Sequence, residues 1–126
     1  MKNNGFTFRR RIAGFKYAFQ GLKRLFTHEA NSWIHAFAAV CVVVAGFLFR
    51  IAAWEWVAVV AAIGFVLAAE AFNSAIERLG DAITEQPNNY IKHAKDLAAA
   101  AVLIAAITAA VIGLLVFLPK LIDCIS

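Results

Sequence analysis

The stretch that most constrains this chain is Leu97–Leu118, which contains no charged residue. A helix of about 20 apolar residues spans the ~30 Å hydrocarbon core of a bilayer. Two further apolar runs, Trp33–Phe49 and Trp54–Ala69, are interrupted only by His35 and Glu55 respectively. The composition, 63% hydrophobic and 16% charged, lies far from the roughly half and quarter of soluble domains. The sequence therefore predicts an all-α integral membrane protein with three transmembrane helices.

We expect one membrane domain over residues 1–126, with spans at about 32–50, 54–84 and 90–118. The second helix has no breaker before Pro87, so at about 45 Å it extends beyond the bilayer. Glu85–Asn89 is expected to form a turn, and Pro119 to end the third span. A signal peptide is excluded because a polar, basic segment precedes the first apolar run and two more runs follow it.

Residues 1–5 are expected to be irregular, and an amphipathic helix is expected over about residues 6–27. Its apolar stripe recurs at spacings of four and three: Phe8, Ile12, Phe15, Phe19, Leu22 and Phe26. The other faces are basic, which favours a helix lying in the membrane interface. A soluble helix packed on a partner is the alternative.

Most Lys and Arg residues precede the first span or lie between the second and third, whereas only Arg50 and Lys120 lie on the other side. The positive-inside rule then predicts a cytosolic N-terminus and an outer C-terminus. The net charge of +4 is explained by topology and anionic lipid, not by nucleic acid. The two cysteines, Cys41 and Cys124, and the scattered histidines show no disulfide or zinc spacing.

A polar stripe marks the end of the second span. At 100° per residue one helix face carries Glu70, Asn73, Ser74, Glu77 and Asp81. Carboxylates at a membrane boundary are costly without a partner, which a cation, a proton or a phosphate-bearing ligand would provide.

This arrangement suits phosphoryl transfer to a lipid, which requires carboxylates for Mg²⁺, cations for phosphates and a base near the acceptor hydroxyl. Only Glu70 lies deep enough to reach a lipid alcohol. No Walker A or kinase glycine-rich loop is present. Alternatives are charged helix ends that only anchor the helices, as in a structural or regulatory subunit, and a small transporter or proton carrier. Against transport, the stripe does not cross the membrane.

The motifs Glu70–Glu77, Asp81, Ala94–Asp96 and Ala99–Leu103 agree in spacing with one known pattern. They resemble the bacterial diacylglycerol kinase and undecaprenol kinase family. The resemblance covers about residues 8–115 and extends to the N-terminal side through Arg10, Tyr17, Gly21-Leu22 and Glu29-Ala-Asn.

The resemblance implies an ATP-dependent lipid kinase of the bacterial inner membrane, a homotrimer with sites at the cytosolic interface built partly from neighbouring subunits. It implies Glu70 as catalytic base, Glu29 and Glu77 as ligands of the Mg²⁺ that accompanies ATP, and Glu70 and Ala99 as lipid-binding residues. Supporting roles fall to Asn73 and Asp81. The implied nucleotide-binding residues are Arg10, Tyr17, Glu29, Glu77, Lys95 and Asp96.

Three positions depart from the family pattern. Gly80 replaces an expected apolar residue, and the turn Gln86–Asn89 differs from the family's loop. His35 stands where the diacylglycerol kinase of Gram-negative enteric bacteria has a glutamate, and it resembles the Gram-positive-type branch. Because that branch includes undecaprenol kinases, both diacylglycerol and undecaprenol are candidate acceptors.

Overall fold

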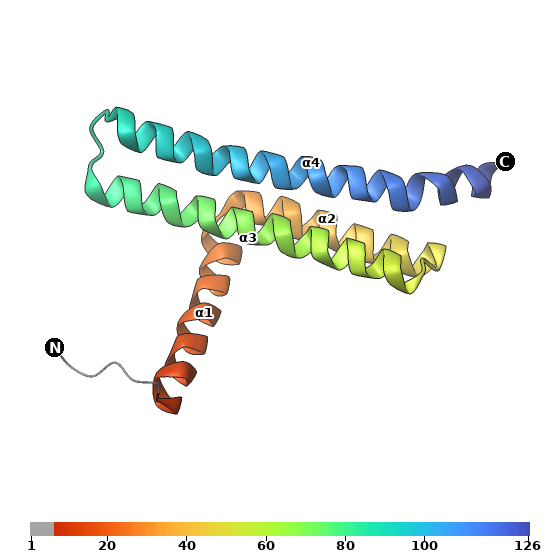
Figure 1. Ribbon diagram of the computed structural model, residues 1–126, viewed down its shortest axis with the longest axis horizontal. Coiled ribbons are helices and arrows are strands. Elements are labelled where there is room, and N and C mark those ends of the chain that lie inside the picture. The colour runs from red at the N-terminus through yellow and green to blue at the C-terminus, as the bar shows by residue number, and fades with distance from the viewer. Residues whose placement is uncertain (1–6) are drawn as a thin grey trace.

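The computed structural model describes residues 7–126, which form four helices joined by short turns (Figure 1). These are α1 (Phe8–His28), α2 (Ala30–Phe49), α3 (Ala53–Ile83) and α4 (Asn89–Ile125). The first three helices begin and end within about two residues of the predicted bounds, which is the usual spread of helix ends. The predictions for residues 1–5, and for a helix start at residue 6, lie outside the described residues.

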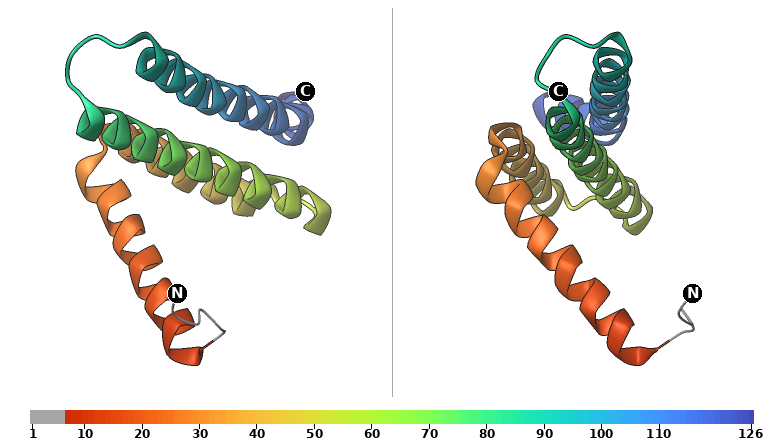
Figure 2. Two further views of the ribbon diagram at one scale, coloured as in Figure 1. Left: turned by 60° about the vertical axis from the view of Figure 1, so that its left-hand side comes forward. Right: turned by 90° about the vertical axis from the view of Figure 1, so that its left-hand side faces the viewer.

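Helices α3 and α4 pack side by side as an antiparallel pair, and α2 packs against α3 (Figures 1 and 2). Helix α1 leaves the start of α2 at a steep angle to the three long helices. The adjoining ends of α3 and α4 project past the start of α2. Since α3 has 31 residues, it is about 46 Å long, which confirms the expected length of the second helix.

The turn between α2 and α3 is fixed by backbone and side-chain bonds. Arg50 adopts a left-handed conformation with φ 52° and ends α2, with its N–H directed at the carbonyls of Gly46 and Phe47. Glu55, the third residue of α3, caps the start of this helix, because its Oε1 accepts a hydrogen bond of 2.9 Å from the N–H of Ala52. This is the reciprocal half of a capping box. The short turn keeps α2 and α3 antiparallel.

The prediction that Pro119 ends the last helix is wrong, because α4 continues through Pro119 to Ile125. A proline inside a helix removes one backbone donor and crowds the preceding turn, and the last turns bend out of line with the rest of α4 in Figure 1. The residues beyond it are held in place: Lys120 Nζ lies 3.0 Å from Glu55 on α3. The ion pair between Lys120 of α4 and Glu55 of α3 therefore supports the helical turns that follow Pro119.

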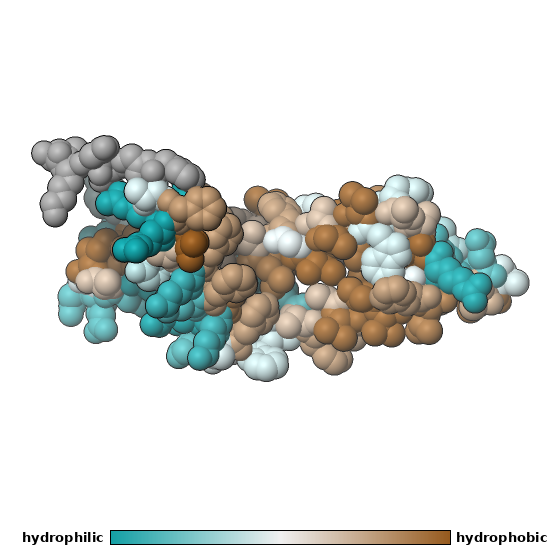
Figure 3. Space-filling model, turned by 90° about the horizontal axis from the view of Figure 1, so that it is seen from below, coloured by the Kyte–Doolittle hydropathy of each residue, from teal (hydrophilic) through white to brown (hydrophobic). Residues whose placement is uncertain are grey.

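The protein buries small apolar residues between its helices and exposes large ones. Two clusters form the core: Val66, Ala69 and Ala105 in one half of the bundle, and Ile51, Val59 and Val116 near the α2–α3 turn. The outward side chains form an apolar band with hydrophilic groups at both ends (Figure 3). Helices α2, α3 and α4 are each long and apolar enough to cross a membrane. This arrangement confirms a membrane protein with three such helices.

Candidate active site

The site begins at Glu70, a carboxylate of α3 that is only 3% exposed. Its Oε1 lies 3.0 Å from Nε2 of His35 on α2. With Glu70 ionised, the carboxylate only accepts hydrogen bonds, and the donor in this contact is Nε2–H of His35. The partner that a buried carboxylate requires is therefore a histidine of the neighbouring helix.

Polar residues of α2 and α3 continue outward from this pair. Glu29 Oε1 accepts a hydrogen bond of 3.0 Å from Arg78. The contacts Glu29–Arg78 and His35–Glu70 fix the antiparallel register, and they bracket Ser32 on α2 and Asn73 on α3. Ser32 is fully buried, and neither Ser32 Oγ nor Asn73 Oδ1 has a hydrogen-bond partner among the described residues.

Farther out, α3 is tied to α4 by predicted site residues. Lys95 Nζ on α4 donates to Asp81 Oδ1 on α3 over 2.6 Å, whereas Lys92 Nζ donates to Asp96 Oδ2 over 2.7 Å within α4. These ends of α3 and α4 are the ones that project past the start of α2 (Figure 1). The structure therefore brings together three of the predicted residues, Asp81, Lys95 and Asp96, at one end of the helix pair.

The predicted metal ligands are Glu29, which is partly buried and held by Arg78, and Glu77, which is exposed on α3. Within residues 7–126 no group of three or more His, Cys, Asp or Glu side chains could hold a metal ion. Mg²⁺ is commonly bound by one or two carboxylates together with substrate phosphates and water. Glu29, Glu77 and the unpartnered Asn73 Oδ1 offer only oxygen donors, the type that this ion prefers, and the structure shows no contact among the three.

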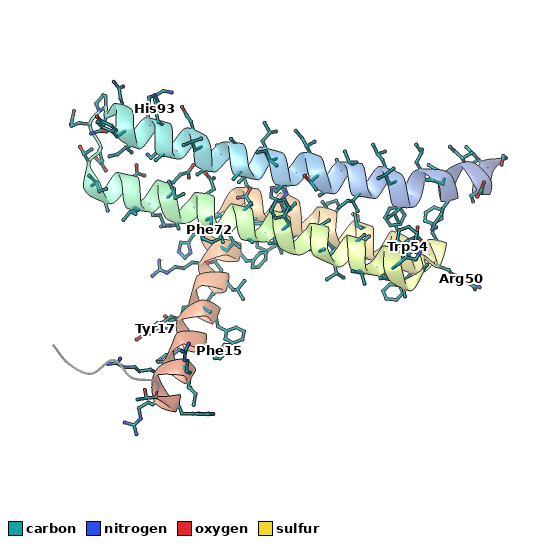
Figure 4. All side chains as sticks on the ribbon, viewed as in Figure 1. Phe15, Tyr17, Arg50, Trp54, Phe72 and His93 are labelled. Carbon is teal, nitrogen blue, oxygen red and sulfur yellow. The ribbon has the colours of Figure 1, made fainter. Side chains whose placement is uncertain are left out.

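The predicted residues of α1 do not reach Glu70 within one chain. Tyr17 projects from α1 well away from the three long helices (Figure 4). Arg10 lies in the first turn of α1, where its backbone N–H donates to Thr7 Oγ1 over 3.3 Å. Ala99 is exposed on α4. One chain therefore supplies only part of the predicted site.

Two pockets adjoin the polar residues. An apolar groove of about 300 Å³ lies between α2, α3 and α4, with His35 as its only titratable lining residue. A second pocket of about 320 Å³ lies between α1 and α3, where Glu29 and Arg78 line it together with small side chains. His35, the partner of Glu70, and the predicted metal ligand Glu29 thus border cavities that a ligand could enter.

The sequence analysis missed His35 and Arg78 as partners of predicted site residues. A signal for His35 was available: it is the one histidine in the first span, which has no Asp, Glu, Lys or Arg, and it lies near the start of that span, while Glu70 lies near the end of the second span. Antiparallel spans place those positions at similar depth. Arg78 follows Glu77 directly in the sequence. Its pairing with Glu29 depends on the register of α3 against α2, which the sequence does not show.

A sequence model of the prokaryotic diacylglycerol kinase family matches residues 16–117. This chain belongs to that family. The match includes most of α1, all of α2 and α3, and α4 as far as Phe117. The family resemblance inferred from Glu70–Glu77 and the Ala94–Asp96 motif is thereby confirmed.

Relatives within the family carry two different names. A Bacillus subtilis protein named undecaprenol kinase is 40% identical over 107 residues, covering 85% of this chain and 87% of the relative. A Synechocystis protein named diacylglycerol kinase is 34% identical over 113 residues, covering 89% of this chain and 65% of the relative. The Escherichia coli K12 diacylglycerol kinase is 32% identical over 111 residues, covering 88% and 91%.

Proposed function

We propose that this protein is an ATP-dependent lipid kinase that phosphorylates the hydroxyl of undecaprenol or diacylglycerol. The observation that carries the proposal is the position of Glu70, which is buried at the inner end of a polar stripe and contacts His35, a residue that lines an apolar groove. Family membership supports the same reaction class. The 40% identity to a relative named undecaprenol kinase favours undecaprenol as the acceptor.

In this reaction Glu70 removes the proton of the lipid hydroxyl. The hydroxyl oxygen forms a bond to the γ-phosphorus of ATP, the bond from that phosphorus to the bridging oxygen breaks, and ADP leaves with its electron pair. The chain's cations at the projecting ends of α3 and α4 are suited to neutralise the nucleotide phosphates, as phosphoryl transfer demands. Lys95 is placed there by its bond to Asp81.

Glu29 and Glu77 would hold Mg²⁺, with Asn73 beside them. When bound, the ion would neutralise charge on the phosphates of ATP. The chain's own contribution is to present carboxylates at the boundary between the buried base and the exposed helix ends. Arg78 donates a hydrogen bond to Glu29 and would compete with the ion for that carboxylate.

We further infer that the protein lies in the bacterial inner membrane as a homotrimer, with its N-terminus and active sites at the cytosolic face. The distribution of Lys and Arg supports the orientation. The position of Tyr17 on α1, which points away from the three long helices of its own chain (Figure 4), supports a site completed by α1 of a neighbouring subunit. Helix α4 also exposes small side chains, such as Ala99, Ala100 and Ala101, and small side chains allow helices to pack closely.

The test is transfer of labelled γ-phosphate from ATP to lipid in detergent micelles, with undecaprenol and diacylglycerol offered in parallel. Wild-type protein is expected to yield labelled lipid that requires Mg²⁺. Glu70→Gln, which removes the base but keeps the shape of the side chain, is expected to lower turnover by about 100-fold or more. No labelled lipid from either acceptor, with folded protein, would contradict the proposal, as would normal turnover in Glu70→Gln.

A further inference from the structure

We propose that His35 is a positioning residue for the base: it holds one oxygen of Glu70 so that the other faces the lipid hydroxyl. This inference rests on the proposed function and adds to it a residue whose role is orientation. It is carried by the only hydrogen bond that the structure shows for the Glu70 side chain among the described residues, 3.0 Å from His35 Nε2.

The need for such a residue follows from the chemistry of a carboxylate. The last torsion of a glutamate side chain is soft and roughly two-fold, so an unrestrained carboxylate samples many orientations. The side chain of Glu70 is 4% exposed and that of His35 is 23% exposed, so water offers little competition for the contact. A charge-assisted bond in this environment is stronger than one in water. His35 therefore fixes Glu70 Oε1 and leaves Oε2 for the substrate.

The apolar groove places His35 where it could act on a lipid. The helices are antiparallel, so His35, Leu67 and Ala106 lie at one end of the groove lining. Val42 and Val59 lie toward the other end. A lipid tail in this groove would bring its hydroxyl end to His35 and Glu70. His35 is thus the point at which the apolar lining meets the polar residues of α2 and α3.

The inference predicts which kinetic constant changes. A reacting group displaced by about 1 Å costs roughly 100-fold in rate, whereas the ATP contacts lie on other residues. His35→Leu removes the donor and keeps the bulk, so we expect kcat to fall by about 10- to 100-fold while KM for ATP stays within about two-fold. His35→Gln retains an N–H donor and should recover much of the lost kcat.

His93→Leu provides the matched control, since it removes a histidine that is exposed at the start of α4 (Figure 4). Its kcat should equal that of the wild type. Normal kcat in His35→Leu, or equal loss in His35→Leu and His35→Gln with both folded, would overturn the positioning role. In either case the kinase proposal would stand as long as wild-type protein labels lipid. Absence of labelled lipid from the wild type would overturn both proposals.

A second measurement does not depend on activity or on a His35 variant. Protein labelled with ¹⁵N-histidine should show one imidazole resonance that moves when Glu70 is replaced by Ala, because Nε2 loses its acceptor. Replacement of the exposed Glu85 by Ala should leave that resonance unchanged. Identical imidazole spectra for the wild type and Glu70→Ala would show that the contact does not exist.

Discussion

At the scale of single residues, the bond between Arg78 and Glu29 sets a guanidinium against a carboxylate that we propose to hold Mg²⁺. The two cations compete for the same oxygens, although Arg78 is more than half exposed and the pair is worth about 1 kcal/mol or less. Arg78→Ala is therefore expected to lower the Mg²⁺ concentration for half-maximal activity by about two- to five-fold. A magnesium titration of lipid phosphorylation measures this.

Arg78→Lys is the control for that titration, because it retains a positive charge near Glu29 without the two-pronged geometry of a guanidinium. Its half-saturating Mg²⁺ concentration should lie between those of the wild type and Arg78→Ala. A rise in Arg78→Ala would instead show that the arginine helps Glu29 to bind the ion.

Glu77 tests the second carboxylate. Glu77→Gln removes a charge that we assign to the metal, so more Mg²⁺ should be needed for half-maximal activity, by about 10-fold or more. Glu85→Gln makes the same change in the turn between α3 and α4, and the titration should not shift. Equal curves for wild type and Glu77→Gln would remove Glu77 from the metal site.

Residue types and spacing were sufficient to predict that three carboxylates lie on one helix. Glu70, Glu77 and Asp81 share a face of one helix, and a single helix has a known period. They were not sufficient for His35 or Arg78, whose partners lie on another helix. Such pairs depend on how far one helix slides along another, and apolar runs restrict that register only to within a turn or so.

At the scale of helices, the α2–α3 contact depends on the absence of a side chain at Gly46. A Cβ at that position would lie 2.6 Å from Cη2 of Trp56, whose ring also packs against Phe47 at a centroid distance of 4.8 Å. Gly46→Ala should therefore lower the free energy of unfolding by about 1–3 kcal/mol, as measured by denaturant titration in micelles. Gly64→Ala in α3, where nothing lies within 4 Å, should cause no loss, and an equal loss in both variants would contradict the contact.

The last turns of α4 depend on Lys120. Lys120→Met leaves Glu55, which is 5% exposed, without its cationic partner on α4, so the helix beyond Pro119 should fray. Amide hydrogen exchange of residues 120–125 should become faster, whereas Lys120→Arg should keep the wild-type rate. Unchanged exchange in Lys120→Met would show that the turns after Pro119 are held by apolar packing alone.

Hydrophobic runs predicted the helices well because each run has to match the thickness of the bilayer. The end of α4 was missed for a physical reason: Pro119 removes local stability, and a tertiary contact from Glu55 restores it. The local sequence shows the destabilising effect of Pro119, but it does not show the contact with Glu55, which comes from another helix.

At the scale of the whole molecule, the native cysteines test the proposed orientation. Cys124 lies near the C-terminal end of α4 and Cys41 lies in the middle of α2. A membrane-impermeant maleimide added to intact spheroplasts should label Cys124, since thiolate formation needs water, and should not label Cys41. Cys124→Ser should abolish the signal. Labelling only after permeabilisation would place the C-terminus in the cytosol.

Glu70, the proposed base, lies at the boundary between the lipid phase and the aqueous phase. In the proposed orientation, the groove lined by His35 would face lipid, whereas the projecting ends of α3 and α4 would extend into water. The effective concentration of the nucleotide would therefore be its amount per volume of solution, whereas that of the lipid acceptor would be its amount per area of membrane. Diluting the acceptor with inert lipid would slow turnover even at a constant bulk amount, and adding more membrane of unchanged composition would not raise it. The fraction of acceptor lipid in the membrane would thus set the turnover rate of the proposed reaction.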